Sequence, residues 1–208
     1  MTNARQLIEK IRTELKPLEE KIVCHRYLEA LRMGSVARER LRIFAEQQYH
    51  IIASDLRSIA LLLSRHGNLP SRPYLLGVLQ GESAAFEALA KFAQALGMSD
   101  EELRASEPFP AALAYSTFVA WLALYGSDAE LAAAFAVNFA AWGANCGRMS
   151  DALKAHYGFK SEAIGFFDLF ANLPPVDDTV LAVVQSGLNR GVVPALIERA
   201  ARLLQAYE

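Results

Sequence analysis

The sequence has few cysteines and no excess of either charge, and these shortages exclude several classes of protein. Two of its 208 residues are cysteines, Cys24 and Cys146, too far apart to form a CxxC metal or redox motif. We therefore expect a reducing, cytoplasmic setting in which each thiol packs as a small apolar group. Lys and Arg number 21 against 23 Asp and Glu, a net charge of −2, so no nucleic-acid partner is expected.

Long hydrophobic runs and strand patterns are also missing. The apolar stretch 131–142 is well short of the ~20 residues that cross a bilayer, so no membrane partner is expected. No segment alternates polar and apolar residues as a strand does, whereas apolar residues recur at helical spacing nearly everywhere. We find no repeat or linker. The sequence therefore predicts one all-α domain over residues 1–208, a bundle of about seven or eight principal helices.

Capping residues, prolines and glycines divide the chain into helices. Two capping boxes, Ser99 with Glu102 and Ser127 with Glu130, mark two helix starts. Breaks are predicted at 66–70, 108–110 and 174–175. The other predicted helices cover about 4–15, 17–33, 35–64, 73–96, 111–125, 161–171, 178–188 and 193–208, with 127–156 following the second capping box.

A polar stripe crosses the most apolar of these helices. Asn138, Trp142 and Asn145 lie at i, i+4 and i+7 and therefore share one face. A buried amide costs free energy unless it is hydrogen-bonded, so this face lines either a pocket or a buried polar network.

Short motifs stand near both ends of the sequence. The N-terminal third carries 25–28 (His-Arg-Tyr-Leu), then Gly34, Leu41 and 44–49 (Phe-Ala-Glu-Gln-Gln-Tyr), and the end carries 204–208 (Leu-Gln-Ala-Tyr-Glu). Together these motifs resemble the TenA/thiaminase II family of the haem-oxygenase-like helical fold. Tyr115, Asn138, Trp142 and Phe166 fall at the family's pocket spacings. The resemblance covers almost the whole chain and implies a central pocket for a small heterocycle, an aminopyrimidine or a thiamine-related compound.

The resemblance also assigns roles that this sequence only partly keeps. The family's nucleophilic cysteine falls at Asn138, which cannot form the covalent intermediate, and its ring-binding aspartate falls at Gln47 or Gln48. Glu208 falls at the catalytic glutamate and would act as general acid and base. Asp55 shares a face with Gln48 and can replace the missing carboxylate, unless it pairs with a basic residue or faces solvent.

These assignments give one catalytic candidate, Glu208, and six candidates for substrate binding. The six are Gln48, Asp55, Tyr115, Asn138, Trp142 and Phe166. We expect a non-covalent hydrolase or, alternatively, an inactive small-molecule binding or accessory protein, with no cofactor. The fold's relatives form dimers and tetramers, so by analogy we expect a homo-oligomer. Trp121 is a further stacking candidate.

Two other functions of the same fold, a di-metal oxidase and a haem protein, each need particular metal-ligating residues. A di-metal oxidase needs carboxylates and histidines along its helices, yet Glu82 has no histidine after it and is expected to face solvent. The GxxxG segment 143–147 resembles part of the distal helix of haem proteins. The proximal haem ligand would then be expected near Glu19. His25 lies six residues beyond that position, and a lone histidine near a helix start is more often structural.

Overall fold

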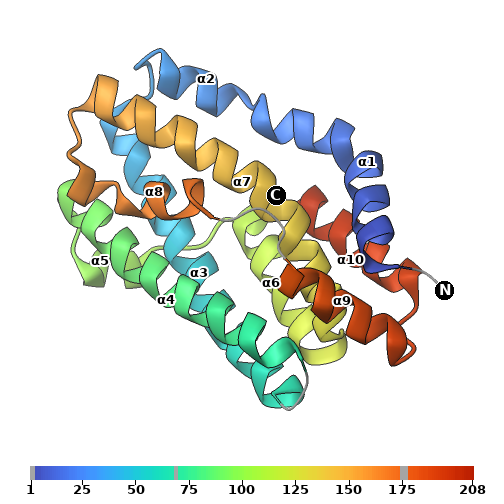
Figure 1. The fold of residues 1–208 in the computed structure, drawn as a ribbon. Helices are drawn as coiled ribbons and strands as arrows, with labels where there is room; N and C mark the ends of the chain where they lie inside the picture. The colour runs from blue at the N-terminus through green and yellow to red at the C-terminus, as the bar shows by residue number, and fades with distance from the viewer. Residues whose placement is uncertain (1–2, 68–69, 174–177) are drawn as a thin grey trace.

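The computed structural model describes residues 3–67, 70–173 and 178–208, and this part of the chain contains ten α-helices and one short 3₁₀ helix (Figure 1). They are α1 (Ala4–Val23), α2 (Arg26–Arg32), α3 (Arg38–His66), α4 (Ser71–Ala95), α5 (Asp100–Ala105), α6 (Pro110–Tyr125), α7 (Asp128–Tyr157), η1 (Ser161–Ala163), α8 (Gly165–Ala171), α9 (Asp178–Asn189) and α10 (Pro194–Tyr207). The all-α prediction is confirmed. The expected number of helices was too low, because α2, α5 and α8 are separate helices of only six or seven residues.

The first helical boundary was wrongly placed. Pro17 lies inside α1 and does not begin a second helix. Proline has no backbone N–H, so the carbonyl of Thr13 loses its helical hydrogen bond. This is tolerated because Pro17 and Thr13 are both exposed to water. The break falls instead at Cys24 and His25, and His25 caps α2 by accepting a hydrogen bond from the N–H of Tyr27 at 3.3 Å.

Two other helix starts show how side-chain caps decide boundaries. Both predicted capping boxes are confirmed, with reciprocal hydrogen bonds at the starts of α5 and α7. Ser35 does not open α3, because its hydroxyl donates to the carbonyl of Ala30 at 3.0 Å and α3 begins at Arg38. The predicted break at 66–70 falls between the end of α3 at His66 and the start of α4 at Ser71, although its residues 68–69, like the predicted break at 174–175, lie outside the described residues.

α7 is the central helix of the bundle. It packs against α1, α2, α3, α6, α8, α9 and α10, while α3 packs against α4 and α6 on the other side of the molecule (Figure 1). Alanine, glycine and serine supply much of its buried surface, which lets neighbouring helices approach closely. Gly143 is one such position, where a Cβ atom would lie 2.8 Å from the carbonyl oxygen of Phe170.

The apolar core forms three clusters around α7. One joins α2, α3, α4, α7 and α8 through a group of phenylalanines, a second joins α1, α7, α9 and α10, and a third joins α3, α4, α6, α7 and α10. No helix among the described residues is long and apolar enough to span a membrane. The polar side chains of the candidate site lie inside this packing.

Candidate functional site

A small cavity of about 40 Å³ lies between α3, α4, α6, α7, α8 and the last residue of the sequence. Eleven residues line it: Gln48, Ile51, Ile52, Asp55, Glu82, Tyr115, Asn138, Phe139, Trp142, Phe170 and Glu208. Six of the seven residues predicted from the sequence are among them. Phe166 is not; it is fully buried in the core, with its ring centroid 6.4 Å from that of Trp142.

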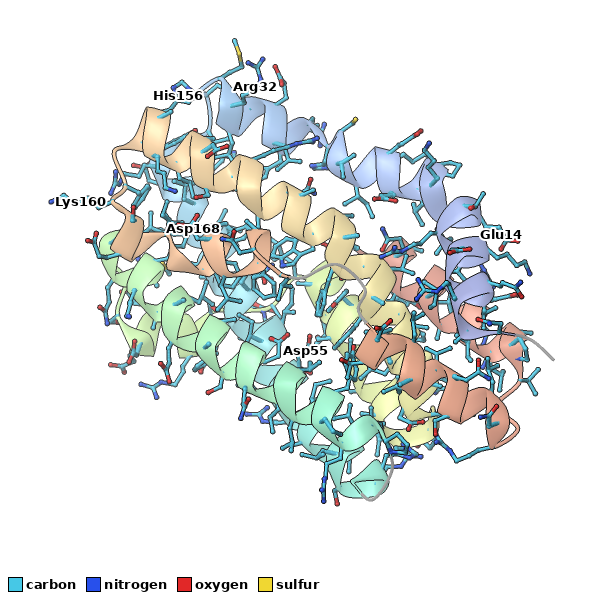
Figure 2. All side chains as sticks on the ribbon, in the orientation of Figure 1. Glu14, Arg32, Asp55, His156, Lys160 and Asp168 are labelled. Atoms are coloured by element: carbon cyan, nitrogen blue, oxygen red, sulfur yellow. The ribbon has the colours of Figure 1, made fainter. Side chains whose placement is uncertain are left out.

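Asp55 extends from the middle of α3 into this cavity and is only 3% exposed. Figure 2 shows it well inside the outline of the molecule, whereas Glu14, Arg32 and Lys160 lie at the periphery. Its Oδ1 atom accepts no hydrogen bond within the described part of the chain. Burial, together with the nearby carboxyls of Glu82 and Glu208, raises the pKa of Asp55 well above its usual value. Asp55 therefore neither pairs with a base nor faces solvent.

Glu82 brings a second carboxyl to the same cavity from α4. It is 6% exposed, and burial raises its pKa to about 7. The expectation that Glu82 faces solvent was wrong. The buried stripe of α4 could have indicated this, because Glu82 is seven residues from Leu75 and from Leu89, which are both buried.

Glu208 supplies the third carboxyl. The residue as a whole is exposed, but its side chain turns inward, and its Oε2 accepts a hydrogen bond from Nδ2 of Asn138 at 3.3 Å. Burial of the carboxyl raises its pKa, and the Asn138 hydrogen bond partly opposes this rise. Nδ2 of Asn138 also donates to Oε1 of Gln205 at 3.4 Å. Asn138 therefore holds the carboxyl of Glu208 at the cavity, and Gln205 is a neighbour that the sequence did not single out.

Aromatic rings and one phenol complete the walls. Tyr115 is buried, and burial, followed by the charges of Asp55, Glu208 and Glu82, raises its pKa well above the usual value, so it stays a protonated hydroxyl. The rings of Phe139 and Phe170 lie 6.3 Å apart, and Trp142 lies 5.8 Å from Phe170. A flat ligand whose edge reaches this space would meet oxygen atoms at that edge and aromatic surface beside its ring.

The structure also places the residues that the sequence left undecided. Gln48 lines the cavity, while Gln47 accepts a hydrogen bond from the N–H of Phe109 and so anchors the start of α6. Trp121 lies on the outer face of α6, 40% exposed. Cys146 is buried in the apolar core, where burial raises the pKa of its thiol and disfavours the thiolate.

A much larger cleft, of about 820 Å³, adjoins the cavity. Its walls come from α1, α4, α7, α8, α9 and Leu173, which follows α8, and it shares Glu82, Phe139 and Phe170 with the small cavity. These three residues therefore lie at the boundary between the two spaces. Across the described part of the chain, no group of three or more His, Cys, Asp or Glu residues is arranged to hold a metal ion.

The arrangement defines a class of protein: an all-α bundle with a cavity at its centre, where three carboxyls and aromatic rings converge from α3, α4, α6, α7 and α8 and from Glu208, which follows α10. Residues 12–163 match the family described as TENA/THI-4/PQQC, and the chain belongs to that family.

Solved structures show the same fold. A TenA homologue from Pseudomonas syringae pv. tomato aligns with a TM-score of 0.79 and 14% identity, covering 96% of this chain and 88% of that one. A domain of unknown function with a haem-oxygenase-like fold from Shewanella denitrificans aligns with a TM-score of 0.64 and 14% identity, covering 100% and 92%.

Among curated proteins, a 4-aminobenzoate synthase from Chlamydia muridarum is 33% identical over 93 residues, 42% of this chain. The match spans 39% of that protein's length.

Proposed function

We propose that the cavity binds the edge of a small nitrogen heterocycle of the aminopyrimidine type. The observation that carries this proposal is the convergence of Asp55, Glu82 and Glu208, three buried carboxyls for which no ion pair occurs among the described residues. Carboxyls buried without a basic partner favour the protonated form, so the ligand they fit carries N–H donors and a positive or ionisable group whose charge lets one carboxyl ionise against it.

An aminopyrimidine supplies this pattern. Its amino group and an adjacent protonated ring nitrogen form two parallel N–H donors, which match the two oxygens of one carboxylate. Oδ1 of Asp55 has no other donor among the described residues. We assign Asp55 the ring-binding role, with Gln48 beside it and with Trp142 and Phe170 against the ring.

Glu208 is the proposed general acid and base. Burial raises the pKa of its carboxyl, which favours the protonated form that a general acid needs before it gives up its proton. In a non-covalent hydrolysis, the oxygen of a water molecule would bond to the carbon that carries the leaving nitrogen as that C–N bond breaks. The carboxyl would give its proton to the departing nitrogen, and the resulting carboxylate would recover a proton from the water. Asn138 acts on this reaction by positioning Glu208.

The second candidate is a binding or accessory protein without turnover. The observation in its favour is the absence of a thiol from the cavity wall, since Asn138 lines it and Cys146 lies in the core. The two candidates share a ligand and differ in whether product forms. Liquid chromatography with mass spectrometry on an incubated aminopyrimidine, using the wild type and Glu208→Gln, separates them.

Binding itself is tested by calorimetry with 4-amino-2-methylpyrimidine. We expect Asp55→Asn to weaken binding by at least tenfold, about 1.4 kcal/mol, because it removes a charge-assisted pair. Glu87→Gln, an exposed substitution on α4, is the control and should bind as the wild type does. Equal affinity in Asp55→Asn and the wild type would reject the proposed role of Asp55.

The distant similarity to a 4-aminobenzoate synthase supplies a comparison ligand. 4-Aminobenzoate carries a carboxylate of its own, which would add negative charge to a site that already holds three carboxyls. We therefore expect it to bind more weakly than 4-amino-2-methylpyrimidine. The opposite order would favour a benzoate ligand.

A further inference from the structure

The central cavity and the cleft beside it differ greatly in size. The cavity, at about 40 Å³, holds little more than one water molecule, whereas the cleft, at about 820 Å³, falls in the range of sites for drug-sized ligands. A compact heterocycle occupies only a small part of their combined volume. Most of the available space therefore lies outside the polar centre.

The walls of the cleft are mainly small and apolar. Alanines and a glycine of α7 line it together with glycines and Val78 of α4, and Leu169 and Leu173 add further apolar surface, while Arg12 and Glu19 of α1 contribute charged side chains. From Pro73 to Glu82, the lining residues extend about 13 Å along α4, taking 1.5 Å per helical residue. Such a space fits a long apolar group.

Two glycines of α4 contribute directly to this space. At Gly77 and Gly81, an added Cβ atom would meet no other atom within 4 Å. Packing therefore does not require glycine there, although glycine inside a helix is about 1 kcal/mol less favourable than alanine. This contrasts with Gly143, where the backbone of Phe170 leaves no room for a side chain. The effect of Gly77 and Gly81 is to widen the cleft.

Glu82 connects the cleft to the polar centre. It is a buried carboxyl that lines both spaces and makes no ion pair among the described residues. The cleft is thus acidic where it borders the site of Asp55, and most of its remaining wall is apolar, with Arg12 and Glu19 of α1 as the charged exceptions.

We propose that the ligand is an elongated amphipathic molecule: a nitrogen heterocycle bound at Asp55 and Glu82 that carries a long apolar substituent lying in the cleft between α4 and α7. This inference rests on the proposed function for its heterocyclic end. It adds that the ligand is amphipathic, because on binding the apolar substituent, and not the ring, would bury most of the ligand's surface.

The test is a series of 4-amino-2-methylpyrimidines with a methyl, butyl or hexyl group on ring carbon 5, measured by calorimetry. In the wild type, affinity should rise about fourfold for each added methylene. Gly77→Leu, which fills the cleft one turn away from Gly81, should abolish this rise and leave the affinity of the methyl compound within twofold. Ala84→Leu also introduces a leucine, on the exposed face of α4, and should keep the full rise.

Each other outcome has a distinct meaning. If the methyl compound binds but affinity does not grow with chain length, the inference is overturned and the proposed function stands. If chain length matters equally in Gly77→Leu and the wild type, the substituent lies elsewhere and the inference is again overturned. If no compound of the series binds, the proposed function itself fails. Far-UV circular dichroism on each variant checks that the fold is retained.

Discussion

The carboxyl cluster predicts that the unliganded protein loses stability as pH rises. Glu82→Gln tests this most cleanly, because the amide keeps the shape of the side chain but cannot ionise. Burial raises the pKa of Glu82 from an ordinary 4.5 to about 7. This difference corresponds to about 3 kcal/mol of unfolding free energy at ~1.36 kcal/mol per pKa unit.

The sign follows from proton binding. Below pH 4.5, both the folded and the unfolded protein hold the proton, and Glu82 carries no penalty. Between pH 4.5 and about 7, the folded protein keeps the proton while the unfolded chain releases it, so the unfolding free energy falls as pH rises. Glu82→Gln lacks this loss, and it also removes a charge that raises the pKa of Asp55.

The assay is urea unfolding followed by circular dichroism at pH 5 and pH 8. We expect Glu82→Gln to be within about 1 kcal/mol of the wild type at pH 5 and up to about 3 kcal/mol more stable at pH 8. Glu87→Gln, on the exposed face of the same helix, should follow the wild type at both values. A Glu82→Gln protein less stable than the wild type at pH 8 would show that a basic group neutralises Glu82, and would refute the reasoning.

Three further predictions concern other parts of the bundle. Wild-type protein should show negligible thiamine hydrolysis in a thiochrome assay, and Asn138→Cys should gain turnover if the pocket keeps the family's geometry; robust wild-type activity would contradict the assignment of Asn138. Gly143→Ala should destabilise the protein by about 1–3 kcal/mol in urea unfolding, since its Cβ would lie 2.8 Å from the carbonyl oxygen of Phe170, and unchanged stability would show that α8 moves freely. We propose that the chain self-associates through the outer face of α6, where Leu113 and Leu124 are half exposed; light scattering should give a smaller mass for Leu113→Glu/Leu124→Glu, and a monomeric wild type would reject this.

The fold could be predicted largely because its signals are local. The capping boxes at Ser99 and Ser127 act within one helical turn, so their sequence pattern suffices to place α5 and α7. Pro17 misled because its effect depends on whether the surrounding helix face is exposed, which the local sequence does not state. The start of α3 was predicted wrongly at Ser35 for a similar reason, because the hydroxyl of Ser35 donates a hydrogen bond to the carbonyl of Ala30 in the preceding helix.

The candidate site was predictable where it followed helical periodicity. Asn138 and Trp142 share one face of α7, and Gln48 and Asp55 share one face of α3, so all four reach the cavity. Glu82 was misjudged because a glutamate is rarely buried unpaired, even though its spacing from Leu75 and Leu89 places it on the buried stripe. That exception to a general rule is also the feature that identifies the site.

The most direct test of the account is a crystal structure of the protein with bound 4-amino-2-methylpyrimidine. We predict that the amino group and the adjacent ring nitrogen lie about 3 Å from the carboxyl oxygens of Asp55, with the ring against Trp142 and Phe170 and with ring carbon 5 directed toward the cleft beside Glu82. Ligand density on the surface, or in the cleft with no nitrogen near Asp55 or Glu82, would contradict the central claim that this carboxyl cluster is the binding site.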